Sequence, residues 1–118
     1  MQRLSEEEFK ENVKAWAEEK GLLKFENRFP QFAKVLEEVQ EIIVALNKVD
    51  RALAEDNRSD YDEARLLLSD AIGDSFVTLE ILSLQVNMSS IDCKTQAWNE
   101  IKGRTGKMIA GSFVKDKK

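Results

Sequence analysis

The stretch that decides the fold is residues 30–46, PQFAKVLEEVQEIIVAL. Apolar side chains recur there every three or four residues, which is the spacing of one face of an α-helix. They are Phe32, Val35, Leu36, Val39, Ile42, Ile43 and Leu46. Pro30 suits the first turn of such a helix. Because apolar positions continue to Leu53, we predict one long helix that starts near Pro30.

Two more helices flank this one in the chain. Ser5 and Glu8 have the spacing of a capping box, so a first helix should open there and end before Gly21. Residues 55–60 (EDNRSD) are polar and predict a loop. A third helix over residues 61–86 is apolar around nearly its whole circumference. Such a helix is normally buried, and in so short a chain this predicts self-association.

The end of the chain completes the expected fold. A fourth helix should begin at Ser89 or Ser90 and end near Gly103. Beyond it, Ala110 and Gly111 separate two apolar pairs, which predicts a small hairpin or an extended arm. We therefore expect an all-α four-helix bundle with a short extended C-terminal arm, as a single domain over residues 1–118.

The composition narrows the possible functions. A net charge of −4 argues against non-specific nucleic-acid binding, which needs a basic surface. The single cysteine, Cys93, cannot form an internal disulfide and suits a reducing compartment. No apolar run reaches the roughly 20 residues that a membrane span needs, and the acidic N-terminus is unlike a signal peptide. We expect a soluble, cytoplasmic protein without a nucleic-acid or membrane partner.

The chain contains no histidine, which excludes histidine-based triads and histidine-ligated zinc. Any catalysis must therefore use carboxylates, lysines, arginines, hydroxyls or the one thiol. Carboxylates prefer hard cations such as Mg²⁺ or Mn²⁺. Two acidic clusters are candidates. The first, in the second helix, is Glu37-Glu38-x-x-Glu41, and the second, in the third helix, is Asp70-x-x-x-Asp74.

Each cluster has two possible explanations. The glutamates could simply form the solvated face of an amphipathic helix, although Glu38 and Glu41 are one turn apart and can converge on one ion. Asp70 and Asp74 interrupt an apolar stretch, where unpaired carboxylates are costly. A salt bridge to Lys34 or Arg65 would neutralise them, and so would a divalent cation held between the two helices. Taken together, the clusters favour the cation.

A basic segment follows the fourth helix. Lys102, Arg104 and Lys107 lie within six residues, close to Asn99 and Gly106. Cations beside glycines suit a phosphate-binding segment. The alternative is a basic tail that balances an acidic body, but a magnesium site favours the phosphate interpretation.

These motifs, in this order, resemble a known family. The pattern Gln31-x-x-Lys34-x-x-Glu37-Glu38-x-x-Glu41, followed by Gly73-Asp74, is similar to the MazG-like branch of the all-α nucleoside triphosphate pyrophosphohydrolases. The ending 98–108 (WNEIKGRTGKM) resembles small MazG-like proteins of phages and bacteria, and the similarity covers about residues 16–114.

The resemblance implies an enzyme that cleaves a nucleoside triphosphate between its α and β phosphates, releasing the monophosphate and pyrophosphate. It implies Mg²⁺ held by EExxE and ExxD motifs, and assembly as a homodimer or homotetramer. By position, Glu38, Glu41 and Asp74 match metal ligands, and Glu37 matches the first acidic residue of EExxE. The glutamate of ExxD would fall on Ala71, so Asp70 is the expected substitute.

The implied reaction suggests roles for the other candidates. Without histidine, the base for the attacking water must be a carboxylate or the metal itself, and we expect a glutamate of EExxE, Glu38 or Glu41. Substrate would contact Lys34, Asn99, Lys102, Arg104 and Lys107, and one of the aromatic residues Trp16, Phe29 and Trp98 could stack on the base. The alternatives are a non-catalytic nucleotide-binding regulator, an alarmone-directed hydrolase, and an acidic-faced protein-interaction module.

Overall fold

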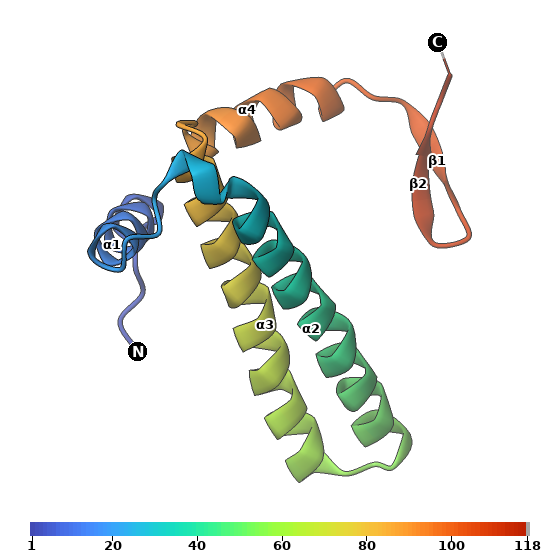
Figure 1. The fold of residues 1–118 in the computed structure, drawn as a ribbon. Coiled ribbons are helices and arrows are strands. Elements are labelled where there is room, and N and C mark those ends of the chain that lie inside the picture. Colours follow the sequence, from blue (N-terminus) through green and yellow to red (C-terminus); the bar gives the residue numbers. More distant parts are fainter. Residues whose placement is uncertain (118) are drawn as a thin grey trace. The chain divides into compact units, whose positions relative to one another are not determined.

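The computed structural model describes residues 1–117 and is mostly helical, with four α-helices and one two-stranded sheet in this part of the chain (Figure 1). The elements are α1 (Glu6–Glu19), a 3₁₀ turn (Phe25–Asn27), α2 (Arg28–Ala54), α3 (Arg58–Gln85), α4 (Ser90–Ile101), β1 (Gly106–Ile109) and β2 (Ser112–Lys115). None of these helices is long and apolar enough to cross a membrane. The chain separates into two compact units, Met1–Asn87 and Met88–Lys118. The single domain over residues 1–118 stays a prediction.

The predicted capping box opens α1. Ser5 Oγ accepts a hydrogen bond of 3.1 Å from the Glu8 amide, and Glu8 Oε1 accepts one of 2.9 Å from the Ser5 amide. Hydrogen bonding of the Glu8 carboxylate to the Ser5 backbone first, and then to the Ser5 side chain, lowers the pKa of Glu8. At the other end Gly21 adopts a φ of 71°, and the Leu22 amide donates to the Ala17 carbonyl at 2.9 Å. The helix therefore ends before Gly21, as predicted.

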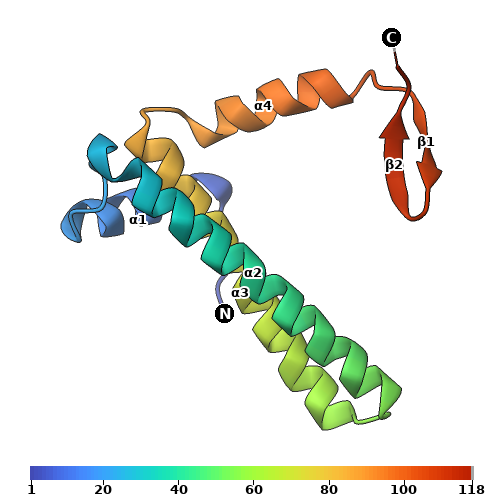
Figure 2. The ribbon, with the colours of Figure 1, turned by 45° about the vertical axis from the view of Figure 1, so that its right-hand side comes forward.

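The central element of the first unit is an antiparallel hairpin of α2 and α3, which lie side by side in both Figure 1 and Figure 2. Pro30 lies in the first turn of α2, as predicted. The loop between the helices is shorter than the predicted 55–60, because Asn57 caps α3: its side chain accepts a hydrogen bond of 3.0 Å from the Asp60 amide. Helix α3 consequently begins at Arg58.

Small side chains form the contact between α2 and α3. Ala45 and Ala52 of α2 and Ala64 and Ala71 of α3 are all buried. Side chains of this size let two helices approach closely. Near the open end of the hairpin the contact becomes polar, where Gln31 Nε2 donates to the Thr78 carbonyl at 3.0 Å.

Helix α1 packs on the C-terminal half of α3. Val13 and Ala17 of α1 are buried with Ile81 of α3, and partly buried apolar side chains surround them: Phe9, Leu22, Leu23 and Val77. Gln85 Nε2 ties the segment after α1 to α3 by donating to the Leu22 carbonyl at 2.7 Å. This cluster is the hydrophobic core of the first unit.

The apolar stripe predicted for α2 lies mostly outside the contact with α3. Val35 is buried and Ile42 is half-buried, but five of the seven positions are exposed: Phe32, Leu36, Val39, Ile43 and Leu46. Helix α3 also has exposed apolar side chains, among them Ile72, Phe76 and Leu79. Within the single chain, α3 is thus not buried on every side. The self-association that its sequence predicts stays a prediction.

The second unit consists of α4 and the hairpin β1–β2. Ser89 is the N-terminal cap residue of α4, as predicted, although its side chain makes no capping hydrogen bond. The strands pair antiparallel, with Met108 opposite Phe113. Ala110 and Gly111 form the turn with φ of 50° and 83°, so of the two predicted alternatives the hairpin is present. A Cβ on Gly106 would lie 2.6 Å from the Phe113 ring, which explains the glycine there.

Candidate functional site

A pocket of about 290 Å³ lies between α2 and α3 and contains every predicted metal ligand. Ten residues line it: Glu37, Glu38, Glu41, Val44, Ala45, Lys48, Leu67, Asp70, Ala71 and Asp74. The first six belong to α2 and the other four to α3. Two clusters about 30 residues apart in sequence therefore share one cavity in the fold.

Helix periodicity explains why these side chains meet. On α2, Glu38 and Glu41 are three residues apart, and on α3, Asp70 and Asp74 are four apart, so each pair lies on one face of its helix. The antiparallel hairpin places the two faces on the same side of the contact between the helices. The buried residues Ala45 and Ala71 form part of the lining, where larger side chains would occupy the cavity.

Ala71, which departs from the resembled ExxD pattern, is a packing residue. It is 6% exposed and belongs to the row of alanines between α2 and α3. Asp70, one position earlier, is exposed at the pocket. The carboxylate on this part of α3 is therefore displaced from the helix contact toward the solvent side of the cavity.

Lys34 pairs with the glutamates and not with the aspartates. Its Nζ lies 3.4 Å from Glu37 Oε1 and 3.2 Å from Glu38 Oε1. Hydrogen bonds to Glu38 first and then to Glu37 raise the pKa of the lysine. Arg65, the other predicted partner of the aspartates, instead lies 5.9 Å from the centre of the Tyr61 ring.

The negative charge of Asp74 is only partly compensated. Within residues 1–117 neither it nor Asp70 forms an ion pair, so the predicted salt-bridge alternative is absent there. Partial burial first, and then repulsion from Asp70 and Glu38, raise the pKa of Asp74. Lys34, which pairs with Glu37 and Glu38, offsets part of this rise from a distance. The negative charge of Asp70 and Asp74 is thus not directly paired with a cation among residues 1–117.

This chemistry suits a divalent cation, because carboxylate oxygens are the donors that Mg²⁺ and Mn²⁺ prefer. The carboxylates are spread apart: across the described part of the chain, no three acidic or cysteine side chains lie close enough together to hold one ion. The five carboxylates share a cavity without converging on a point. The donor type and the uncompensated charge fit the metal, and the magnesium site stays a prediction.

The predicted phosphate ligands belong to the second unit. Asn99 lies on α4, Lys102 and Arg104 follow that helix, and Lys107 lies on β1. Arg104 Nη2 is 4.0 Å from Glu100 Oε2. The assignment of these residues to the substrate stays a prediction.

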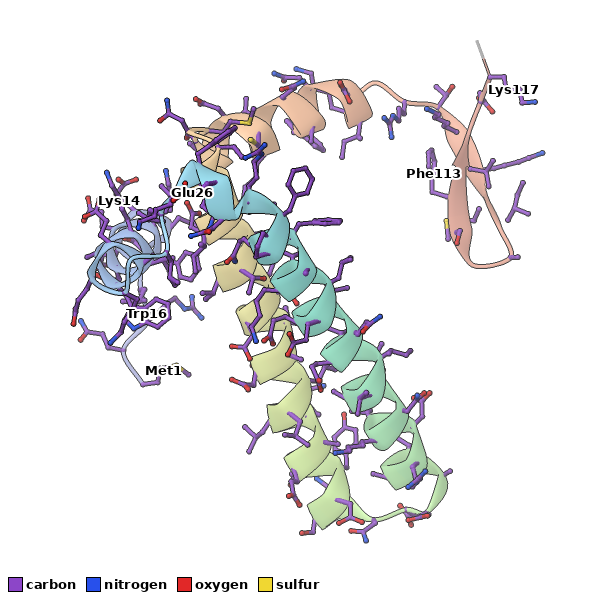
Figure 3. The ribbon with its side chains drawn as sticks, viewed as in Figure 1. Met1, Lys14, Trp16, Glu26, Phe113 and Lys117 are labelled. Atoms are coloured by element: carbon purple, nitrogen blue, oxygen red, sulfur yellow. The ribbon has the colours of Figure 1, made fainter. Side chains whose placement is uncertain are left out.

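The predicted stacking aromatics lie outside the lining of the pocket. Trp16 lies on α1 and is 49% exposed (Figure 3). Phe29 is exposed at the start of α2, where the Arg28 guanidinium is 5.0 Å from the ring centre. Trp98 is exposed on α4. Their roles in stacking stay predictions.

Lys48 is the charged lining residue that was not predicted from the sequence. It is the one cation among the ten residues that line the pocket. The signal was present in the sequence, since Lys48 follows Glu41 by seven residues, or two helical turns, and therefore lies on the same face.

No family model, no curated protein and no solved structure matches the chain.

Proposed function

We propose that this protein is a Mg²⁺-dependent nucleoside triphosphate pyrophosphohydrolase that releases a nucleoside monophosphate and pyrophosphate. The observation that carries the proposal is the pocket in which Glu37, Glu38 and Glu41 of α2 meet Asp70 and Asp74 of α3. The sequence resemblance to MazG-like enzymes supports the same reaction, because its EExxE motif and Asp74 both contribute to this cavity.

The carboxylates would hold the metal from two sides. Glu38, Glu41, Asp70 and Asp74 are the main ligands in this proposal, with Glu37 at the edge. Bound Mg²⁺ (or Mn²⁺) would neutralise phosphate oxygens and the charge that develops on the pyrophosphate leaving group. In a chain without histidine, a glutamate of the EExxE motif, Glu38 or Glu41, would take the proton of the water that attacks the α-phosphorus.

The other candidates would bind the nucleotide. Lys34 can exchange its contacts with Glu37 and Glu38 for a phosphate once the glutamates bind metal. In the proposal the C-terminal cations Lys102, Arg104 and Lys107 also contact phosphate. Asn99 contacts the base or ribose, and an aromatic residue (Trp16, Phe29 or Trp98) stacks on the base.

We also propose that the active form is a homodimer or homotetramer, in which the helices complete a four-helix bundle. One surface of α2 faces α3. On one side of that surface lie the pocket residues Glu37, Glu41 and Lys48, and on the other side lie the exposed residues Leu36 and Ile43. Exposed apolar stripes of this kind are normally covered. A second copy could cover the side of Leu36 and Ile43 while the pocket stays open.

We also place the enzyme in the cytosol, where its exposed Cys93 would stay reduced.

A panel of canonical and damaged nucleoside triphosphates tests the proposal. With Mg²⁺ or Mn²⁺, at least one should yield pyrophosphate and a monophosphate. Glu38→Gln and Asp74→Asn, which keep side-chain shape, should abolish the release, while Glu11→Gln on the exposed surface of α1 should not. If no nucleotide on the panel is turned over, the enzyme proposal is wrong.

A second candidate is a nucleotide-binding regulator without turnover. It is favoured by Ala71, which stands where the resembled family has a glutamate, and by the lack of three converging carboxylates within residues 1–117. Tight nucleotide binding without product, in the same panel, would support the regulator over the enzyme.

A further inference from the structure

The pocket between α2 and α3 combines five carboxylates with a single ammonium group, that of Lys48. Lys34 is already engaged by Glu37 and Glu38. Lys48, by contrast, forms no ion pair in the part of the chain that the structure describes, although carboxylates line the same cavity. An uncommitted cation at the edge of an acidic cavity is a ready ligand for an anion that enters with metal.

The position of Lys48 along the helix indicates which part of a ligand it would meet. It lies two turns beyond Glu41, about 10 Å along the helix axis. Side chains on a helix generally lean toward its N-terminus, which for Lys48 is the direction of Val44, Ala45 and the glutamates that line the same pocket. The carboxylates therefore mark one end of the cavity and the ammonium group marks the other.

A second groove continues from this end toward the tip of the hairpin. Its volume is about 270 Å³, and it shares Lys48 and Leu67 with the first pocket. Arg51 lines the second groove only. Lys48 thus lines both cavities, whereas Glu55, Asp60 and Glu63 make the lining of the second groove acidic. A linear polyphosphate that extends from the first pocket would therefore reach Lys48 and not continue into the second groove.

We propose that Lys48 binds the terminal phosphates of a polyphosphate ligand whose other end would be held by Mg²⁺ bound at the carboxylates of the pocket. The inference rests on the proposed function and assigns the β- and γ-phosphate end of the substrate to residues of the first unit. Lys48 is a binding residue in this scheme, because it contacts the leaving pyrophosphate and not the attacking water.

Inorganic tripolyphosphate is the probe, since it has the phosphate chain without base or sugar. Isothermal titration of the full chain with Mg²⁺ present should show binding that Lys48→Ala weakens about 10- to 100-fold, the range expected for a charge-assisted hydrogen bond. Lys48→Arg should restore affinity to within about 3-fold, because it keeps the charge and the donors.

Arg51→Ala is the matched control. It removes the same charge from the same helix, one turn away, at a residue outside the first pocket. It should change tripolyphosphate affinity by less than about 3-fold. Titration with Mg²⁺ alone gives a second readout: Lys48→Ala should bind the ion as tightly as the wild type or more tightly, because a competing cation has been removed.

The outcomes separate this inference from the proposed function. Equal tripolyphosphate affinity of the wild type and Lys48→Ala, an equal loss in Arg51→Ala, or no binding to the wild type would each overturn the role of Lys48. Lys48-dependent binding without turnover of any nucleoside triphosphate would leave the inference standing and reject the enzyme. If turnover is present, Lys48→Ala should raise KM about 10-fold or more while kcat changes less than about 3-fold.

Discussion

At the scale of single residues, the pocket carboxylates differ in how their charge is accommodated. Glu37 and Glu38 share the Lys34 ammonium group, at 3.4 and 3.2 Å. Asp74 has no such partner among the described residues and is half-buried beside Asp70, so its pKa is raised. A raised carboxylate pKa means that folding disfavours the ionised form, which is the form present at neutral pH.

This predicts a specific pH dependence for Asp74→Asn. Because the pKa of Asp74 in the folded protein lies above its ordinary value of 3.8, the folded state binds more protons between the two values, and stability falls as pH rises through that window. Without metal at pH 7, Asp74→Asn should therefore unfold at a higher urea concentration than the wild type. The difference should shrink as the pH approaches 3.8 from above. A destabilised variant at pH 7 would contradict this account of the charge.

With magnesium bound, the wild type should become more stable than Asp74→Asn. A ligand that binds only the folded state adds about 2.7 kcal/mol of stability at 100 times its Kd. Wild type should gain roughly this amount from Mg²⁺ at that concentration, and Asp74→Asn should gain much less. Urea unfolding with Mg²⁺ and with a chelator measures both values, and equal gains in the two proteins would exclude Asp74 as a ligand.

At the scale of elements, the hairpin of α2 and α3 shows what the sequence could and could not predict. Periodicity and the capping box correctly predicted both ends of α1 and the length of α2. The predicted loop was too long because Asn57, assigned to the loop, caps α3. The contact surface of α2 was also not predictable from hydrophobicity, because it is formed by small residues such as Ala45 and Ala52 and by polar Gln31.

Ala71 provides a test at this scale. Its place in the alanine row means that Ala71→Glu, which restores the resembled ExxD pattern, would force a carboxylate into the helix contact. We expect a loss of about 3 kcal/mol or more in the free energy of unfolding, because the buried charge has no partner there. Thermal or urea unfolding measures it. Ala33→Glu on the exposed side of α2 is the control and should be nearly neutral. A stable Ala71→Glu protein with tighter Mg²⁺ binding would show instead that the contact can open to admit a sixth carboxylate.

At the scale of the whole molecule, the sequence predicted only the part of the candidate site that lies within the first unit, Met1–Asn87. The five predicted carboxylates line one pocket, because two helix faces joined by a short loop place them there. Their role as metal ligands stays a prediction. The role of Lys102, Arg104 and Lys107 depends on how an assembled protein places its second unit, which local sequence patterns do not encode. Lys48 was overlooked for a different reason: a lone lysine on a charged helix face resembles any solvated residue.

The exposed apolar flank of the hairpin predicts the state of association. If a second copy covers it, Ile43→Lys should convert the oligomer to a monomer, because it places a charge among exposed side chains such as Leu36 and Val39. Analytical ultracentrifugation measures the mass. Leu66→Lys is the matched control, since Leu66 is 73% exposed on the side of α3 turned away from α2. A wild-type protein that is monomeric at high concentration would contradict this expectation.

The three-residue tip between α2 and α3 has a practical consequence. Helix ends on both sides are capped locally, by Asn57 on α3 and by backbone hydrogen bonds from Glu55 and Asp56 on α2. Extra chain inserted at Asp56 would therefore leave the register of the two helices unchanged, whereas one residue added inside either helix would turn every later side chain by about 100°. The tip is accordingly a suitable attachment point for a fluorescent reporter. A change in length within either helix would instead move the pocket side chains out of position.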